Sequence, residues 1–275
     1  MNVSILVLVG AGGTAALWAA QTVLLVRVQE PWRVGLLRHG SATPSVRWGM
    51  KVALQSVLLA LVFGFPALVG EEPLGYHRDR LLPASWLLLA GVVASVVLGF
   101  SVPFALNVAV GWVKISPRYG VASGVRKAVR GLLSPLPLAF VEEAVFRGVV
   151  LDQLLRAMPS REGMVVALVF SSAGFASVHF FRKQKRVFLP AVGLFGLGLM
   201  LGTVYVAGGY SYWLPVGIHA GGILFIQVWR PFVVYRGPAG LIGYSSYPMC
   251  GLLGLFSMAA YATILVYWLK GGVAT

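Results

Sequence analysis

Residues 138–150 read LAFVEEAVFRGVV, and this stretch places three charged side chains inside an apolar segment. The surrounding segment, residues 132–155, is long enough to cross the ~30 Å hydrocarbon core of a bilayer, because a helix needs about 20 residues for that. Ionisable groups inside such a span are costly, and they usually face a bundle interior or a water-filled cavity. Glu142, Glu143 and Arg147 therefore indicate a functional site within a membrane protein.

The composition of the whole chain agrees with a membrane location. Of its 275 residues, 58% are hydrophobic and 11% are charged, whereas soluble domains carry about 25% charged residues. This composition excludes a soluble enzyme, a disordered protein and a disulfide scaffold. The single cysteine, Cys250, cannot form an internal disulfide or a multi-cysteine zinc site.

Eight apolar runs predict the fold, which is an all-α, polytopic membrane helix bundle of about eight transmembrane helices. The runs cover residues 3–26, 51–70, 85–113, 132–155, 163–181, 187–208, 212–230 and 251–269. With no linker or repeat between them, we expect residues 1–275 to form a single integral membrane domain. The stretch from Glu30 to Trp48 mixes tryptophans with arginines, so we expect it to lie along the membrane interface.

The basic residues, which give the chain a net charge of +14, gather in alternate loops. The odd-numbered loops hold sixteen of them: Arg27, Arg33, Arg38, Arg47, Lys51, Lys114, Arg118, Arg126, Lys127, Arg130, Arg182, Lys183, Lys185, Arg186, Arg230 and Arg236. The opposite side holds five: Arg78, Arg80, Arg156, Arg161 and Lys270. The positive-inside rule then predicts cytoplasmic odd-numbered loops and both termini outside. Short basic clusters between spans predict membrane lipids, not nucleic acid, as partners.

Helical geometry separates the two glutamates of the fourth run. Glu143 and Arg147 are four residues apart, so they share one helix face in the favoured order for an ion pair. Glu142 points about 100° away and is left to face another group. A carboxylate that is free in this way suits a general base.

Two histidines lie in the fifth and seventh apolar runs. His179 follows Phe175 by four residues, so the two rings share a helix face near the end of the fifth run. His219 lies within the seventh run and is followed by Gly221 and Gly222, which allow close helix approach. One free glutamate and two histidines in three neighbouring spans predict a buried polar active-site cavity.

This ordered set of residues resembles the signature motifs of the CPBP (Abi) intramembrane proteases, which include CAAX-prenyl endopeptidases and bacteriocin-processing or immunity proteins. The motif-bearing catalytic core spans residues 132–230. The resemblance implies an intramembrane endopeptidase in which Glu142 and His179 activate a water and His219 stabilises the oxyanion. It also implies supporting positions at Glu143 and Arg147 and a membrane-anchored protein or peptide as substrate. Phe175 belongs to the same pocket.

One position departs from the family pattern. Many members have Asn or Asp four residues after the third histidine, whereas this chain has Ile223. A second polar donor for the oxyanion must then be absent or come from elsewhere. Asn107, in the third apolar run, is the candidate replacement.

Other interpretations of the same residues stay open. Two histidines and one glutamate are also a familiar catalytic zinc set, so a protease that uses a divalent metal such as zinc is an alternative, although the H-E-x-x-H spacing is absent. No cofactor is certain. A noncatalytic binding or immunity protein would keep the fold without the reaction. A proton-coupled carrier would explain buried acids, but the first half of the chain has no ionisable residue within its spans.

Overall fold

The computed structural model describes residues 3–27, 43–73, 75–77, 86–117, 120–132, 134–180, 188–244 and 247–272. Its long helices are α1 (Val3–Arg27), α2 (Pro44–Leu68), α4 (Trp86–Ala109), α5 (Val121–Leu132), α8 (Arg161–Phe180), α9 (Phe188–Ala207), α10 (Trp213–Trp229) and α12 (Leu252–Gly272). The shorter elements are α6 (Pro135–Glu143), η1 (Ala144–Leu151), α7 (Asp152–Ala157), η2 (Arg230–Phe232), α11 (Ala239–Ile242), η3 (Pro248–Cys250) and the strands β1 (Val113–Ile115) and β2 (Val233–Tyr235).

Within the described residues, five helical stretches are long and apolar enough to cross a membrane. They are Trp48–Leu68, Trp86–Ala109, Arg161–His179, Phe188–Ala207 and Leu252–Lys270. The prediction of an all-α membrane helix bundle is therefore confirmed. The other three predicted spans correspond to α1, to the continuous run α6–η1–α7, and to α10, which has 17 residues. The count of eight crossings stays a prediction.

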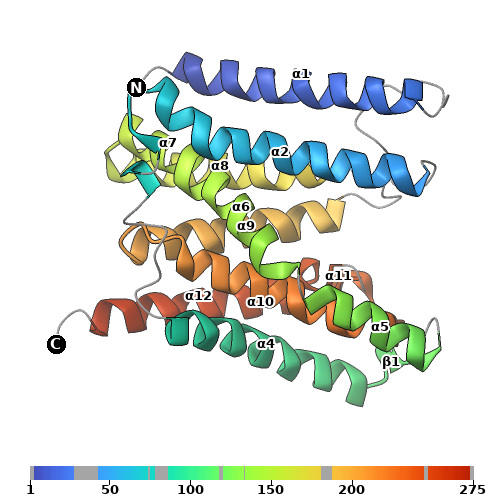
Figure 1. Cartoon of the computed structure of the whole chain (residues 1–275). Helices are drawn as coiled ribbons and strands as arrows, with labels where there is room; N and C mark the ends of the chain where they lie inside the picture. The colour runs from blue at the N-terminus through green and yellow to red at the C-terminus, as the bar shows by residue number, and fades with distance from the viewer. Residues whose placement is uncertain are drawn as a thin grey trace.

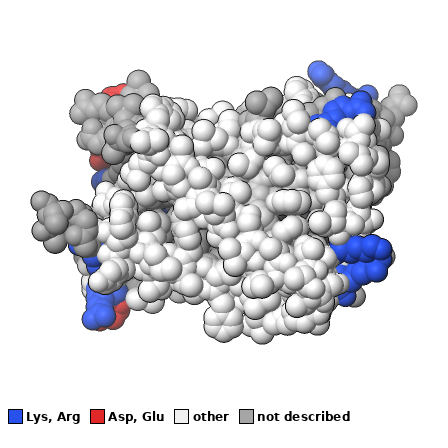
Figure 2. Space-filling model, turned by 90° about the horizontal axis from the view of Figure 1, so that it is seen from below, with Lys and Arg blue, Asp and Glu red and all other residues white. Residues whose placement is uncertain are grey.

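The long helices lie side by side, so their ends form the two ends of the bundle (Figure 1). Helix α1 begins and α12 ends at the same end, while α5 and β1 lie at the opposite end (Figure 1). Figure 2 shows charged side chains at both ends of the face that it draws, with an uncharged belt between them. This arrangement matches a hydrocarbon layer around the middle of the helices and water at their ends.

Helices α4 and α10 run parallel, and the glycines of α10 let them approach closely. A Cβ atom at Gly217 would lie 2.8 Å from Val92, and one at Gly221 would lie 2.9 Å from Val96. Further along, Phe104 of α4 stacks against the α10 aromatics with ring centroids 5.6 Å and 4.9 Å apart. The small residues beside His219 therefore serve helix packing.

Three details differ from the sequence-based expectations. The strands β1 and β2 form an antiparallel pair that joins the ends of α4 and α10; strands of three residues are too short for an alternating pattern to show. Helix α2 begins at Pro44, so residues 44–48 of the expected interfacial stretch start a helix, while residues 28–42 lie outside the described residues. The third loop contains a helix, α5, and the basic residues 182–186 also lie outside the described residues.

The fourth predicted span changes its helical type along its length. It starts as an α-helix with Pro135 in its first turn, continues from Ala144 to Leu151 as a π-helix, and ends in α7. Side chains from elsewhere bond to carbonyls of the π-helical segment: the Ser171 hydroxyl donates to Phe146 O at 3.0 Å, and Tyr76 donates to Gly148 O at 2.8 Å. Such π segments occur often at functional sites, and this one begins directly after Glu143.

Candidate active site

Glutamates of α6 and histidines of α8 and α10 come together inside the bundle. Helix α6 contributes Glu142 and Glu143, α8 contributes His179 near its last turn, and α10 contributes His219 in its first half. These helices lie next to one another near the centre of the bundle (Figure 1). The structure thus brings together the residues that the motifs singled out from three separate spans.

Glu143 forms the buried base of the site. Arg147 Nη1 lies 3.1 Å from Glu143 Oε1 and 3.0 Å from Oε2, as the four-residue spacing predicts. His219 Nδ1 lies 2.8 Å from the same Oε1 atom. The side chains of Glu143 and Arg147 are 0% and 1% exposed. Glu143 therefore does more than neutralise Arg147, because it also holds the ring of His219.

Glu142 occupies the other side of the site. Its Oε2 atom lies 3.7 Å from Nε2 of His179 and 3.7 Å from Nε2 of His219. Both separations exceed the usual range of a hydrogen bond, and a bridging water suits polar atoms at this distance. The side chain of Glu142 is 14% exposed and that of His179 is 15% exposed, so this side of the site is accessible while Glu143 is sealed.

The hydrogen bonds at Nδ1 decide which atom each histidine presents to Glu142. His179 Nδ1 lies 2.8 Å from the carbonyl oxygen of Phe175, which can only accept, so this nitrogen carries the proton. The Glu143 carboxylate that pairs with Arg147 acts as an acceptor, so His219 Nδ1 also donates. When the rings are neutral, both Nε2 atoms offer a lone pair toward the same carboxylate oxygen.

Phe175 packs in the middle of the cluster. Its ring centroid lies 4.8 Å from that of His179 and 5.6 Å from that of His219. The Arg147 guanidinium lies over the same ring, with Cζ 4.8 Å from the centroid. Phe175 itself is fully buried. It therefore separates the buried ion pair from His179 and limits the rotation of both imidazoles.

Helix α9 adds a contact that the motifs did not predict. Arg147 Nη2 donates to the backbone carbonyl of Gly198 at 2.9 Å. A Cβ atom at Gly198 would lie 2.9 Å from the Cβ atom of Ser172, so only glycine lets α8 and α9 approach this closely. A backbone acceptor has no side-chain signature, although the glycines at 193, 196, 198 and 202 mark α9 as a close-packing helix.

Asn107 and Ile223, the two residues connected with the departure from the family pattern, do not lie where an oxyanion donor would be needed. Asn107 is buried near the end of α4, eleven residues beyond Val96, which faces the turn after His219. At 1.5 Å per residue this is about 16 Å along the helix, too far for an oxyanion donor beside His219. Ile223 packs against the apolar cluster that contains Ala139 and Ala220. Asn107 therefore does not supply the second donor.

A metal site is the alternative interpretation of the glutamate and the two histidines. Among the residues that the structure describes, no group of three or more His, Cys, Asp or Glu side chains is arranged to hold a metal ion. No reaction step is therefore assigned to a metal, and dependence on one is left to experiment.

A membrane helix bundle with glutamate and histidine side chains converging inside it is the arrangement that the sequence analysis expects of an intramembrane hydrolase. Residues 125–224 match the family model of the type II CAAX prenyl endopeptidase Rce1-like domain. The matched segment contains the glutamates, the arginine and the two histidines of the site, so the match agrees with the resemblance that the motifs predicted. Comparisons with curated proteins and with solved structures gave no match.

Proposed function

We propose that this protein is an intramembrane endopeptidase that cleaves a membrane-associated protein or peptide, with Glu142 as general base. The observation that carries the proposal is the convergence of two histidine Nε2 atoms on Glu142 Oε2, each at 3.7 Å, in the accessible part of the site. The family match supports a protease.

A water between Glu142 and His179 would be held by both acceptors. It donates one proton toward the Glu142 carboxylate and the other toward His179 Nε2, which leaves an oxygen lone pair for the scissile carbonyl carbon. Glu142 takes the first proton as the carbon–oxygen bond forms. The C–N bond then breaks, and the same proton passes from Glu142 to the departing amine.

The two histidines serve different roles because different groups lie behind them. His179 donates from Nδ1 to a backbone carbonyl, so in the neutral form of the ring Nε2 is the atom that accepts from water. His219 donates to the Glu143 carboxylate, which stabilises an imidazolium whose Nε2–H can donate to the oxyanion. Arg147 pairs with Glu143 and holds its carboxylate in place for this task.

The first substrate to test is a prenylated peptide with a C-terminal CAAX sequence, because the matched family is described as a prenyl endopeptidase. A pool of membrane-protein peptides covers other membrane-anchored substrates. A noncatalytic protein of the same fold would bind such peptides without cutting them.

The test uses the purified full chain in lipid nanodiscs, with cleavage read by mass spectrometry. We expect Glu142→Gln to lower cleavage by about 10²- to 10⁴-fold, the usual contribution of a general base, while peptide binding persists because the side chain keeps its shape. His179→Ala should also remove most cleavage. The control is Glu162→Gln, since Glu162 is an exposed glutamate in the first turn of α8.

Each protein is assayed with and without a chelator. Cleavage that survives chelation and is lost in Glu142→Gln supports the glutamate mechanism. Loss of cleavage on chelation, restored by zinc, would favour the metal-dependent protease instead. Unchanged cleavage in Glu142→Gln would overturn the proposed role of Glu142, and absence of cleavage by the folded wild type across the whole pool would favour a binding protein.

A further inference from the structure

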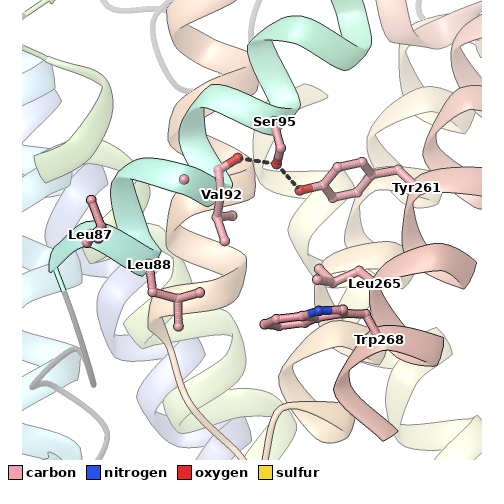
Figure 3. Close-up of a pocket in the computed structure, with 8 residues that line it drawn as sticks. Leu87, Leu88, Val92, Ser95, Tyr261, Leu265 and Trp268 are labelled. Atoms are coloured by element: carbon pink, nitrogen blue, oxygen red, sulfur yellow. Dashed lines mark hydrogen bonds between the residues drawn. The ribbon is translucent and has the colours of Figure 1, made fainter. Parts of the chain in front are cut away.

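A lateral groove lies between the first half of α4 and the second half of α12, apart from the glutamate and histidine site. It has a volume of about 440 Å³. Figure 3 shows the α4 residues on one side and the α12 residues facing them across the gap. Its lining residues are Leu87, Leu88, Gly91, Val92, Ser95, Tyr261, Leu265 and Trp268.

The polar atoms of the groove are already paired with each other. The Ser95 hydroxyl donates to Val92 O at 2.8 Å, so the proton of the 2.7 Å contact between Ser95 Oγ and Tyr261 Oη comes from Tyr261 (Figure 3). Both hydroxyl protons are therefore used within the protein. An occupant without polar groups leaves no buried donor unsatisfied, and none of the described residues that line the groove is charged.

The groove opens toward the surroundings of the bundle at membrane depth. Leu87 is 83% exposed and Trp268 is 56% exposed, and both belong to stretches that are apolar enough to cross a membrane. From Leu87 to Ser95 the groove follows eight residues of α4, or about 12 Å at 1.5 Å per residue. Around a stretch that crosses a bilayer, the surrounding medium is lipid hydrocarbon.

We propose that this groove binds one hydrocarbon chain of a bilayer lipid as a specific site. A lipid chain already lies in hydrocarbon, so it gains no hydrophobic free energy by entering the groove. Its binding comes instead from dispersion contacts with the leucines and with the indole of Trp268. The bound chain also supports the active site, because Val92 lines the groove and packs against Gly217, two residues before His219.

The experiment fills the groove without disturbing the packing around it. A Cβ atom at Gly91 meets no heavy atom within 4 Å, so the Cβ of Gly91→Leu fits without a clash and the rest of its side chain extends into the groove that Gly91 lines. The matched control is Gly99→Leu, because Gly99 has equally open space on the same helix but does not line the groove.

The full chain is reconstituted in nanodiscs with a phospholipid that carries a diazirine in one acyl chain, then irradiated and mapped by peptide mass spectrometry. We expect labelling to concentrate on residues 87–95 and 261–268 and to fall about fivefold there in Gly91→Leu, a loss that corresponds to a modest change in binding energy. In Gly99→Leu it should persist.

Labelling spread evenly along the exposed face of α12, and unchanged in Gly91→Leu, would overturn the proposal. Protection of the groove in the wild type by a second copy or by an added substrate peptide would also overturn it, because the lipid chain would then not be the occupant. Neither readout depends on cleavage, so the outcome is independent of the proposed protease activity.

Discussion

At the scale of single residues, the oxygen atom Oε1 of Glu143 joins the two charged parts of the site. It accepts one hydrogen bond from Arg147 Nη1 at 3.1 Å and another from His219 Nδ1 at 2.8 Å. A buried ion pair contributes little net stability, but removal of one partner leaves the other charge buried and unpaired. The value of this pair is therefore the orientation that it gives to His219.

Arg147→Met tests this role. We expect the substitution to lower the free energy of unfolding by about 3 to 5 kcal/mol, because the Glu143 carboxylate would lose its buried cation. The double variant Glu143→Gln/Arg147→Met should recover most of the stability, since neither charge is then buried. Its cleavage activity should stay low, because His219 lacks the carboxylate that favours its donor form.

Thermal unfolding in detergent and the peptide cleavage assay measure the two effects separately. Full activity in the double variant would contradict the orienting role of Glu143. A double variant as unstable as Arg147→Met would contradict the unpaired-charge explanation.

At the scale of elements, the π-helical segment η1 depends on a glycine that faces an aromatic side chain. A Cβ atom at Gly148 would lie 2.2 Å from the Tyr212 hydroxyl and 2.5 Å from its ring. Tyr212 cannot move away freely, because its hydroxyl bonds to His77 Nδ1 at 2.8 Å and His77 Nε2 bonds to Val62 O at 2.7 Å. This chain of contacts joins α2, α10 and η1.

Gly148→Ala should therefore destabilise the protein, although alanine is normally the better helix former. We expect a loss of about 1 to 3 kcal/mol, typical of overpacking in a close-packed interior. The control is Gly64→Ala on α2, where a Cβ atom meets no heavy atom within 4 Å, so its melting temperature should stay level or rise. Equal melting temperatures for Gly148→Ala and the wild type would contradict the close packing of η1 against Tyr212.

At the scale of the whole molecule, the distribution of charge predicts how the bundle sits in the membrane. Figure 2 shows Lys and Arg at both ends, with Asp and Glu at only one end of the face that it draws. Helix α5, at one end, contains Arg126 and Lys127. Glu162 lies in the first turn of α8, and Glu71 comes three residues after the end of α2. The positive-inside rule predicts that the α5 end faces the cytoplasm.

Cysteine labelling tests this orientation. The native Cys250 is 2% exposed and is first replaced by serine. In that background, Lys127→Cys should react with a membrane-impermeant maleimide only after the membrane is opened, while Glu162→Cys should react in intact cells. The reverse pattern would contradict the predicted topology, and the unsubstituted Cys250→Ser protein controls for nonspecific labelling.

The sequence by itself determined the class of fold and the chemical groups of the site. Apolar runs of about 20 residues leave a helix as the stable way to satisfy the backbone in lipid, and ionisable residues are so costly there that Glu142, Glu143, Arg147 and His219 stood out. The Glu143–Arg147 pair also followed from local helix geometry, because both residues lie on one turn.

Only the tertiary structure decided how these groups meet. The hydrogen bond from His219 to Glu143, the shared approach to Glu142 and the Gly198 carbonyl behind Arg147 each join residues more than thirty positions apart. The exclusion of Asn107 from the site depends on how far along α4 it lies from the turn that faces His219. Such contacts depend on the rotation and depth of each helix, which are set by side-chain packing against its neighbours and not by the sequence of that helix alone.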